Sequence, residues 1–361
     1  MSYICSIGLG IPKYRLSQQR VKEMVQEIFP YSKREINRLL PVFDHAQVDE
    51  RQFVVETNWF TENHSFQERN NLFIELAKAY ALKAIDDCLH QMAFLSNPID
   101  YEDIDMIIFV SSTGVATPSL DVHVMNERPF RQDVKRMPLW GLGCAGGAIG
   151  LARAHDWLSA NPDKSALVIC CELCSLTFQK GDLKKSNLIG TALFGDGIGA
   201  AVIVGETSPL IQHSKNKVPR LLQSDSYTKK DSISVMGWQI IETGFEVIFS
   251  KSIPALVQSF WREHVQLFFN QHQLNENAIA TFIAHPGGKK VIEAMQHVLQ
   301  ADVDKFRHSI SVLRKHGNMS SATVLYVLYS WMKEARYTNE KSVLSALGPG
   351  FSSELILMEW M

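Results

Sequence analysis

The chain has 361 residues, of which 46% are hydrophobic and 20% charged, so it can form one large α/β domain or two fused halves. The 36 Lys and Arg residues nearly balance the 38 Asp and Glu residues, for a formal net charge of −2 at pH 7. This balance gives no reason to expect nucleic acid or an anionic membrane as a partner. No apolar run approaches the roughly 18 residues that a membrane span requires.

The first residues, MSYICSIGLGIPKYR, contain a short apolar run without a preceding basic segment or a small-residue cleavage site. We interpret them as a first strand and turn, and we expect a cytoplasmic protein. Six cysteines in so long a chain do not suggest a disulfide framework, which agrees with a reducing compartment. Cys171 and Cys174 form a CxxC spacing without the second pair of a zinc site, and we expect no metal.

Hydrophobic periodicity predicts the elements of the first half. Helical patterns occur in VKEMVQEIF, in KREINRLL and, at greater length, over Phe73–Leu89. Three continuous apolar runs then predict buried strands at Asp105–Ser112, Ser165–Leu173 and Ile198–Gly205. An apolar helix that begins near Cys144 lies between the first two runs, which gives a strand–helix–strand rhythm.

The polar segment Thr207–Asp231 is the best candidate for a linker or a surface hairpin. After it we expect a helix over Ser252–His272, a buried strand over Ala278–His285, two more helices and two closing strands. We therefore predict an α/β fold of two similar halves, residues 1–230 and 231–361, each a mixed sheet with helices on its faces.

The stretch PLWGLGCAGGAIGLARAHDWL places a single cysteine, Cys144, among four glycines at the start of the apolar helix. Backbone N–H groups and aligned peptide dipoles at a helix N-terminus favour a thiolate over a thiol. The glycines allow an acyl group or a carrier arm to approach the sulfur closely. A core cysteine beside packing glycines is the simpler alternative, and an isolated cysteine would favour it.

Two further residues lie at similar strand-to-helix junctions. In FIAHPGG, His285 ends a predicted strand, which is where ligands of open α/β sheets bind. In RKHGNMSSATVL, Asn318 lies in a Gly-containing turn before a helix that we expect Ser320 or Ser321 to cap. A lone histidine is more often structural, but Cys, His and Asn in three such settings together favour catalysis.

These residue types suit acyl transfer followed by carbon–carbon bond formation. We expect His285 to hold Cys144 as the thiolate of a thiolate–imidazolium pair that accepts an acyl group from a thioester. His285 and Asn318 can then donate hydrogen bonds to the carbonyl of a malonyl thioester and stabilise the enolate that forms as carbon dioxide leaves. The carbanion attacks the acyl-cysteine, and no cofactor is required.

At these residues the sequence resembles the chalcone-synthase-like enzymes, the type III polyketide synthases of the thiolase superfamily. The resemblance rests on GLGCAGGAIGLARA, TALFGDGIGAAVIVG, AHPGGKKVIEAM, KHGNMSSATVLYVL and ALGPGFSSELILMEW, which follow one another in order. It implies a thiolase-like fold, in which two duplicated halves place mixed sheets and helices in layers around buried central helices. It also implies a homodimer that takes acyl-CoA starters and malonyl-CoA extenders and cyclises its product in one active site.

By motif position, the resemblance assigns catalysis to Cys144, His285 and Asn318, and a gatekeeping aromatic ring to Phe194. The loop Gly348-Pro349-Gly350 corresponds to the loop that shapes the cyclisation cavity. The positions that line the starter and elongation pockets correspond to Ser112, Thr113, Thr117, Cys174 and Thr177.

The sequence departs from the plant members of this family at three places. Val247 stands where they carry a second gatekeeping phenylalanine, and Ala346-Leu347 where their terminal loop opens with Gly-Phe. Arg51 is what remains of a basic cluster that grips the phosphates of CoA, so an acyl carrier protein is an alternative starter donor. We interpret the missing ring as a wider apolar passage and predict a medium- to long-chain fatty acyl starter, with alkylpyrones or alkylresorcinols as products.

Three alternatives remain. A ketoacyl-ACP synthase of the III type uses similar residues for a single condensation, but the FGDG, GPG and AHPGG segments argue against it. A papain-like cysteine hydrolase would need its cysteine in a CGSCW-like string near the N-terminus, which the sequence lacks. A non-catalytic protein that has kept the fold is disfavoured because all three catalytic residue types are present.

Overall fold

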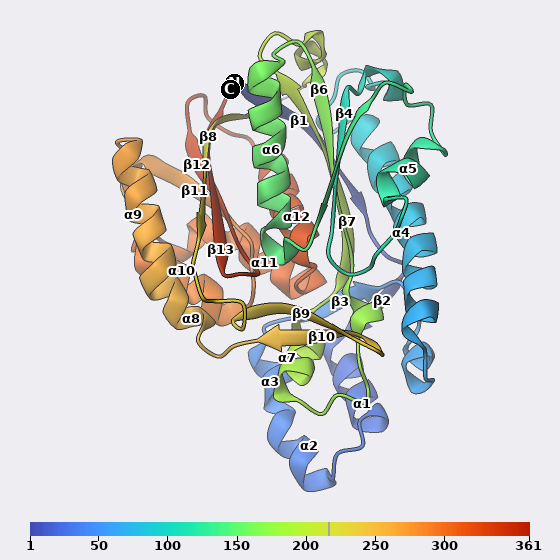
Figure 1. Ribbon diagram of the computed structural model, residues 1–361. Coiled ribbons are helices and arrows are strands. Elements are labelled where there is room, and N and C mark those ends of the chain that lie inside the picture. Colours follow the sequence, from blue (N-terminus) through green and yellow to red (C-terminus); the bar gives the residue numbers. More distant parts are fainter. Residues whose placement is uncertain (216) are drawn as a thin grey trace.

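A mixed β-sheet runs through the computed structural model, which describes residues 1–215 and 217–361 (Figure 1). Its nine strands, within these residues, are β1 (Ser2–Gly10), β4 (Met106–Ser111), β5 (Lys135–Trp140), β6 (Ser165–Leu173), β7 (Asp196–Gly205), β8 (Pro219–Thr228), β11 (Ile279–Ala284), β12 (Lys341–Gly348) and β13 (Ser352–Trp360). They follow the order β11-β12-β13-β8-β1-β7-β6-β4-β5. The buried strands predicted from apolar runs are therefore confirmed as β4, β6, β7 and β11.

The same strand pattern occurs twice in this sheet. β4 is parallel to β6, β6 is antiparallel to β7, and β7 is antiparallel to β1. In the second half, β11 is parallel to β12, β12 is antiparallel to β13, and β13 is antiparallel to β8. The two groups meet where β1 pairs with β8. The predicted fold of two similar halves is confirmed, whereas the boundary at residue 230 stays a prediction.

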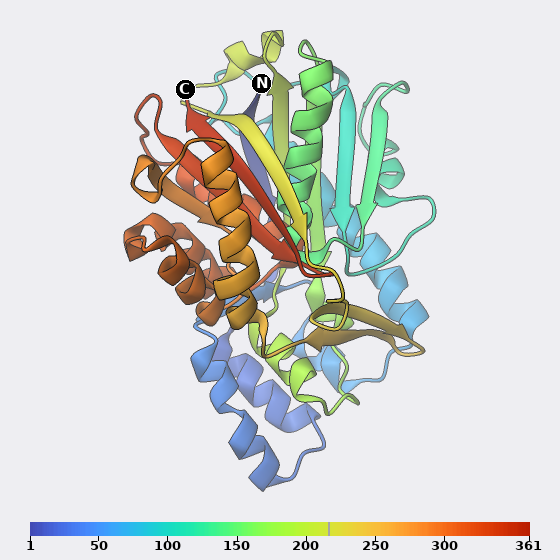
Figure 2. The ribbon, with the colours of Figure 1, turned by 60° about the vertical axis from the view of Figure 1, so that its left-hand side comes forward.

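Two apolar helices, α6 (Gly146–Ala160) and α12 (Thr323–Met332), lie between the two halves of the sheet (Figures 1 and 2). Leu151 of α6 and Leu325 of α12 are fully buried, and both belong to the core that fills this middle layer. A helix can be buried on all sides only if apolar residues surround it, and the sequences AIGLA and TVLYVL meet that condition. This layer positions the N-terminal ends of both helices, which adjoin Cys144 and Asn318.

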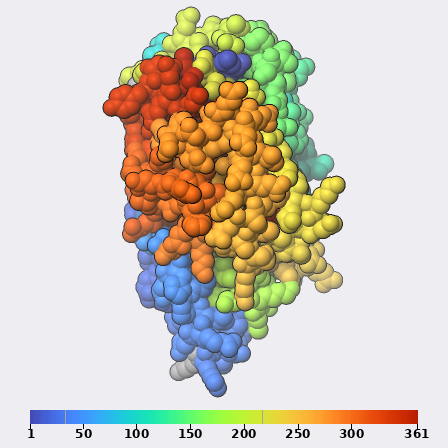
Figure 3. All heavy atoms as spheres, turned by 90° about the vertical axis from the view of Figure 1, so that its left-hand side faces the viewer, coloured from blue at the N-terminus to red at the C-terminus, as the bar shows by residue number. Residues whose placement is uncertain are grey.

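The other helices cover the outer faces of the sheet or form a unit at one end of the molecule. α4 packs against β1 and β7, α9 and α10 cover the opposite outer face, and α1 to α3 extend from the lower end (Figures 1 and 3). Among the described residues, no helix combines the length and the apolar character needed to cross a membrane. The bounds are α1 (Gln18–Ile28), α2 (Lys33–Leu39), α3 (Pro41–His45), α4 (Phe66–Leu89), α5 (Leu120–Met125), α7 (Lys185–Leu193), α8 (Ile253–Leu256), α9 (Arg262–Gln271), α10 (Lys289–Leu299) and α11 (Arg307–His316).

Two short ribbons lie below the main sheet in Figure 1. β2 (Tyr14–Ser17) pairs with β3 (Glu50–Phe53), and β9 (Met236–Ile241) pairs with β10 (Gly244–Phe249). Both ribbons contribute residues to the candidate site.

We predicted a linker or surface hairpin over Thr207–Asp231, and this prediction was wrong for Pro219–Thr228, which form β8. Residue 216 of this segment lies outside the described residues. β8 pairs with β13 along its length and lies in the middle of the sheet. Leu221 is fully buried, but most of the following residues are partly or fully exposed. Backbone hydrogen bonds hold a strand whatever its side chains are, so a polar composition did not reveal it.

Candidate active site

Cys144 lies in a 3₁₀ turn, Gly143–Ala145, which follows β5 and leads into α6. Gly143 has a φ of +49°, and a Cβ atom there would lie 2.7 Å from the ring of Pro349. The Gly143 N–H donates to Ser112 Oγ at 2.9 Å, so the end of β4 also holds the turn. The turn presents the thiol at the N-terminal end of α6, where Cys144 is 9% exposed.

Replacing Gly143 with Ala is expected to lower both stability and activity. The left-handed backbone costs a residue with a side chain about 1–2 kcal/mol, and the new methyl group would overlap Pro349. We expect the free energy of unfolding in urea to fall by about 2 kcal/mol and condensation to fall at least about tenfold. Gly181→Ala is the matched control, because no atom of residues 1–215 and 217–361 lies within 4 Å of a Cβ atom there. Equal effects of the two substitutions would contradict a special role of the turn.

Asn318 lies in the turn between α11 and α12. Its Oδ1 accepts the N–H of Ser320 at 2.8 Å, and its Nδ2 donates toward the carbonyl of Gly287 at 3.4 Å. These contacts orient the amide, whose Nδ2 lies 3.9 Å and whose Oδ1 lies 3.8 Å from Cys144 Sγ. Asn318 therefore places an N–H donor beside the thiol.

The expected cap of α12 by Ser320 or Ser321 was wrong. A 3₁₀ turn at Ser320–Ala322 precedes α12, and within the described part of the chain no side chain caps the helix at its N-cap residue, Ala322. Thr323 Oγ1 accepts the N–H of Met319 at 2.8 Å instead. Ser321 is thereby free to donate to a buried carboxylate, that of Glu172, at 2.6 Å.

His285 follows the last residue of β11, and its N–H donates to the carbonyl of Ser345 at 2.8 Å. The side chain is buried, and neither ring nitrogen has a hydrogen-bond partner among the residues that the structure describes. Burial lowers the pKa of His285 to about 3 and raises the pKa of Cys144 to about 11. These directions favour a neutral imidazole and a neutral thiol, which is opposite to the expected ion pair. A neutral imidazole still offers one N–H donor and one proton acceptor.

Glu172 is a buried carboxylate that the sequence analysis missed. It accepts hydrogen bonds from the Ser112 N–H at 3.0 Å, from Thr113 Oγ1 at 2.9 Å and from Ser321 Oγ at 2.6 Å. It thus connects β6 to the end of β4 and to the Asn318 turn. The available sequence signal is one acidic residue inside an otherwise apolar run.

The activity of the protein is expected to rise with pH through about 7, because burial raises the pKa of Glu172 to about 7. The ionised carboxylate accepts all three hydrogen bonds, whereas the proton of the neutral carboxyl group competes with one of the three donors, so we expect the site to be best ordered above this pH. Stability should change in the opposite direction. A raised carboxyl pKa means that the folded state binds the proton more tightly, and the free energy of unfolding falls between pH 4.5 and 7 by up to about 3 kcal/mol. Rate profiles and urea titrations across this range test both signs. Glu172→Gln should flatten the rate profile but remove only the Glu172 share of the stability change, because burial also raises the pKa of Asp196 and of Glu354 to about 7.

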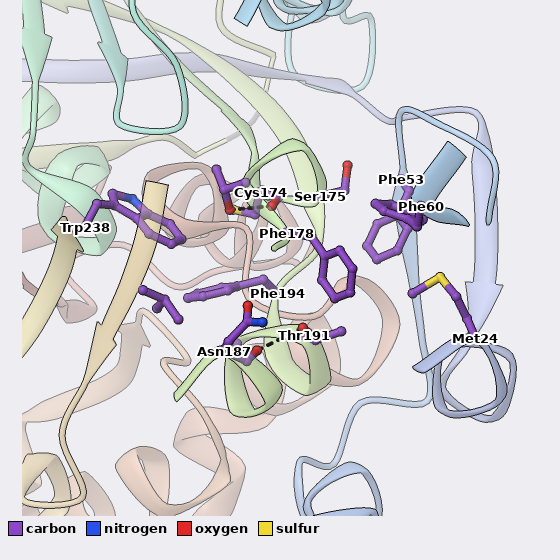
Figure 4. Close-up of a pocket in the computed structure, with 13 residues that line it drawn as sticks. Met24, Phe53, Phe60, Cys174, Ser175, Phe178, Asn187, Thr191, Phe194 and Trp238 are labelled. Atoms are coloured by element: carbon purple, nitrogen blue, oxygen red, sulfur yellow. Dashed lines mark hydrogen bonds between the residues drawn. The ribbon is translucent and has the colours of Figure 1, made fainter. Parts of the chain in front are cut away.

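An apolar pocket lies between α7, the β9–β10 ribbon and the N-terminal part of the chain (Figure 4). The assigned residues Phe194, Val247, Cys174 and Thr177 all line it. Further apolar lining residues were not predicted from the sequence: Phe178, which follows Thr177, and four residues from other segments, Met24, Phe53, Phe60 and Trp238.

The pocket is narrow because Trp238 fills part of it. Trp238 pairs directly with Val247 across the β9–β10 ribbon, and its ring lies 5.8 Å from the ring of Phe194. The enclosed volume is about 30 Å³, room for a water molecule or two. The wider passage expected from the missing ring at position 247 is therefore not present. A ring from the neighbouring strand occupies that space.

The remaining assigned residues lie in several places. Thr113 lines a small hollow beside Arg69, and Thr117 lines a separate surface hollow with Trp140. Gly348 approaches the nucleophile turn so closely that a Cβ atom there would lie 2.6 Å from Cβ of Ala145. Within the described residues, no group of three or more His, Cys, Asp or Glu side chains is placed to hold a metal ion.

The assignment of Arg51 to the phosphates of CoA was wrong. Arg51 is fully buried, and its guanidinium donates to backbone carbonyls at the end of α7. The side chain points inward from β3, so it does not reach solvent. The assignment rested on the position of Arg51 in the motif, but the direction of a strand side chain depends on what the strand packs against.

Models of the chalcone and stilbene synthase family match almost the whole chain, with the N-terminal domain over residues 2–208 and the C-terminal domain over residues 227–361. A Bacillus subtilis (strain 168) protein named putative chalcone synthase is 45% identical over 361 residues, 100% of this chain and 99% of that protein. The 1,3,6,8-tetrahydroxynaphthalene synthase of Streptomyces peucetius subsp. caesius is 32% identical over 360 residues, 99% of this chain and 93% of that enzyme. The crystal structure of the corresponding enzyme of Streptomyces coelicolor A3(2), a bacterial type III polyketide synthase, superposes with a TM-score of 0.91 at 27% identity, over 99% of each chain. The chain therefore belongs to the chalcone and stilbene synthase family and is a type III polyketide synthase, a transferase that forms carbon–carbon bonds by condensation.

Proposed function

We propose that the protein condenses a medium- to long-chain fatty acyl starter with malonyl-CoA, repeats the step and cyclises the product to an alkylpyrone or an alkylresorcinol. The observation that supports this substrate class is the composition of the pocket, whose lining is dominated by aromatic and aliphatic side chains (Figure 4). The pocket is linked to the nucleophile through Phe194, which lines it and makes a backbone bridge with Asn318, whose side chain lies beside Cys144. It leads away toward Met24 in α1.

In the first step, Cys144 Sγ attacks the carbonyl carbon of the acyl thioester. A free ring nitrogen of His285 accepts the thiol proton, and this proton passes to the departing CoA thiolate. The acyl group is then held on Cys144 as a new thioester.

In the second step, the carbonyl of malonyl-CoA accepts hydrogen bonds from Asn318 Nδ2 and from an N–H of His285. Carbon dioxide leaves, and the electron pair of the broken bond forms an enolate that these donors stabilise. The enolate carbon attacks the acyl carbon, a carbon–carbon bond forms, and Cys144 leaves as a thiolate. A low-dielectric, buried site strengthens both hydrogen bonds.

A starter derived from malonyl-CoA itself is a second candidate. The pocket volume of about 30 Å³ favours it, because small-molecule sites usually enclose about 300–1,000 Å³. A relative at 32% identity is named 1,3,6,8-tetrahydroxynaphthalene synthase. A fatty starter requires the ring of Trp238 or of Phe178 to turn aside first.

The proposed assembly is a homodimer in the cytoplasm, with CoA thioesters as substrates and an acyl carrier protein as an alternative starter donor. The β5 edge of the sheet supports the dimer, because β5 ends the strand order and its Trp140 is 51% exposed. A protein commonly covers such an edge by pairing. Light scattering on a sizing column tests the dimer, and a monomer at micromolar concentration would contradict it.

The decisive experiment incubates the protein with radiolabelled malonyl-CoA and a series of acyl-CoAs from acetyl to stearoyl, with products identified by mass spectrometry. Pyrones or resorcinols that peak at long starters support the first candidate. A product from malonyl-CoA alone supports the second. A single β-ketoacyl product formed only with malonyl carrier protein would assign the chain to the ketoacyl-ACP synthase III reaction.

A further inference from the structure

The Arg51 side chain is fully buried and donates several hydrogen bonds. Its Nη1 donates to the carbonyls of Thr191 at 2.8 Å and Phe194 at 2.9 Å. Its Nη2 donates to the carbonyl of Ala192 at 2.8 Å and to Gln18 Oε1. One guanidinium thereby holds three carbonyls of a single chain segment.

These carbonyls belong to the last turn of α7 and to its C-cap residue, Phe194. The last carbonyls of a helix lack partners within the helix, and a cation at this end is attracted to the helix dipole. Burial lowers the pKa of Arg51 to about 9, so the group is still charged at neutral pH. The nearby buried carboxyl of Asp196 partly offsets the cost of burying this charge.

The backbone of Asn318, in the candidate active site, also binds the chain segment that follows Ala192. The Asn318 N–H donates to the carbonyl of Leu193 at 2.8 Å, and the Gly195 N–H donates to the carbonyl of Asn318 at 3.0 Å. Space around the segment is tight, since a Cβ atom at Gly195 would lie 2.3 Å from the carbonyl oxygen of His316. The Arg51 guanidinium and the Asn318 backbone therefore bind different residues of the same five-residue segment, Thr191–Gly195.

We propose that Arg51 is a positioning residue for the condensation reaction. Its guanidinium fixes the segment Thr191–Gly195 and thereby sets both the ring of Phe194 in the acyl pocket and the amide of Asn318 beside Cys144. This inference rests on the proposed roles of Phe194 and Asn318. A planar fork with donors in fixed directions can serve several carbonyls at once, whereas the single ammonium of lysine cannot.

Arg51→Lys tests the proposal, with Arg15→Ala as the matched control. Arg15 lies on the adjoining strand β2, is largely exposed and pairs with Glu50, so its loss perturbs the same ribbon without touching α7. In Arg51→Lys, we expect hydrogen exchange to become at least about tenfold faster at the amides of Phe194, Gly195 and Asn318. The kcat for condensation should fall by about 10- to 100-fold with little change in the KM of malonyl-CoA.

The two readouts separate the possible outcomes. Faster exchange spread evenly over the whole protein would show a purely structural role and overturn the proposal. Faster exchange confined to the segment, with kcat and starter preference unchanged, would also overturn it. If Arg51→Lys does not fold, Gln18→Ala is used, since Gln18 Nε2 also donates to the carbonyl of Ala192, at 3.1 Å, and smaller changes are expected in the same amides. Exchange requires no substrate, so it tests the positioning role even if the wild-type protein turns over none of the starters and the proposed function fails.

Discussion

Substitution of Cys144 by Ala is expected to reduce condensation by at least about 10⁴-fold while malonyl-CoA decarboxylation stays within about tenfold of the wild-type rate. Without the thiol, no acyl group can be held for the attack of the enolate. The donors that stabilise the enolate belong to His285 and Asn318, and both remain in place. Release of labelled carbon dioxide from malonyl-CoA measures decarboxylation, and extraction of labelled polyketide measures condensation.

Asn318→Leu is the complementary variant, because it keeps the thiol and removes one donor. We expect decarboxylation to fall by about 10²- to 10³-fold in this variant, as for the loss of one oxyanion-stabilising donor. Loading of Cys144 with an acyl group, detected by intact-protein mass spectrometry, should continue. If Cys144→Ala loses decarboxylation as completely as Asn318→Leu does, the assignment of separate roles to these residues is incorrect.

Trp238→Ala and Val247→Phe are expected to shift starter preference in opposite directions. Trp238 and Val247 are paired across the β9–β10 ribbon, and both line a pocket of about 30 Å³. Removal of the indole opens the pocket toward Phe194, so the ratio of kcat/KM for long and short starters should rise by about tenfold or more. A phenylalanine at position 247 adds a second ring to an already filled space and should lower that ratio by a similar factor.

Competition between acyl-CoAs of different length in one reaction measures this ratio directly. Ile240→Ala is the control, since Ile240 lies on the same strand as Trp238 but is 54% exposed. A starter profile that is the same in all three variants would contradict the view that this ribbon selects the acyl chain.

Much of the fold could be predicted because the relevant signals are local. Continuous apolar runs predicted β4, β6, β7 and β11, since a strand covered on both faces needs apolar residues in every position. The segment of β8 was misjudged, because many of its side chains are polar and its place in the sheet depends on backbone pairing with β13. The amino-acid composition of the segment does not indicate this backbone pairing.

The candidate site also contains residues that could be predicted from local sequence and residues that could not. Cys144, His285 and Asn318 were recognisable because each lies at a junction whose glycines and neighbouring strand or helix are adjacent in sequence. Arg51 was assigned to the phosphates of CoA, and Trp238 was missed. The inward direction of Arg51 depends on how β3 packs against α7, and the place of Trp238 depends on the register of β9 against β10.

The sequence by itself determined the family, the order of most strands and helices, and the three residue types that suit condensation, because each is encoded in contiguous residues. The tertiary structure alone decided the burial of Cys144 and His285, the width of the pocket and the partners of Arg51. Burial raises the pKa of Cys144 and lowers that of His285, and burial is a property of the assembled core. The pocket is closed by side chains from segments far apart in the chain, such as Met24 and Trp238, so its volume exists only once those segments have packed together.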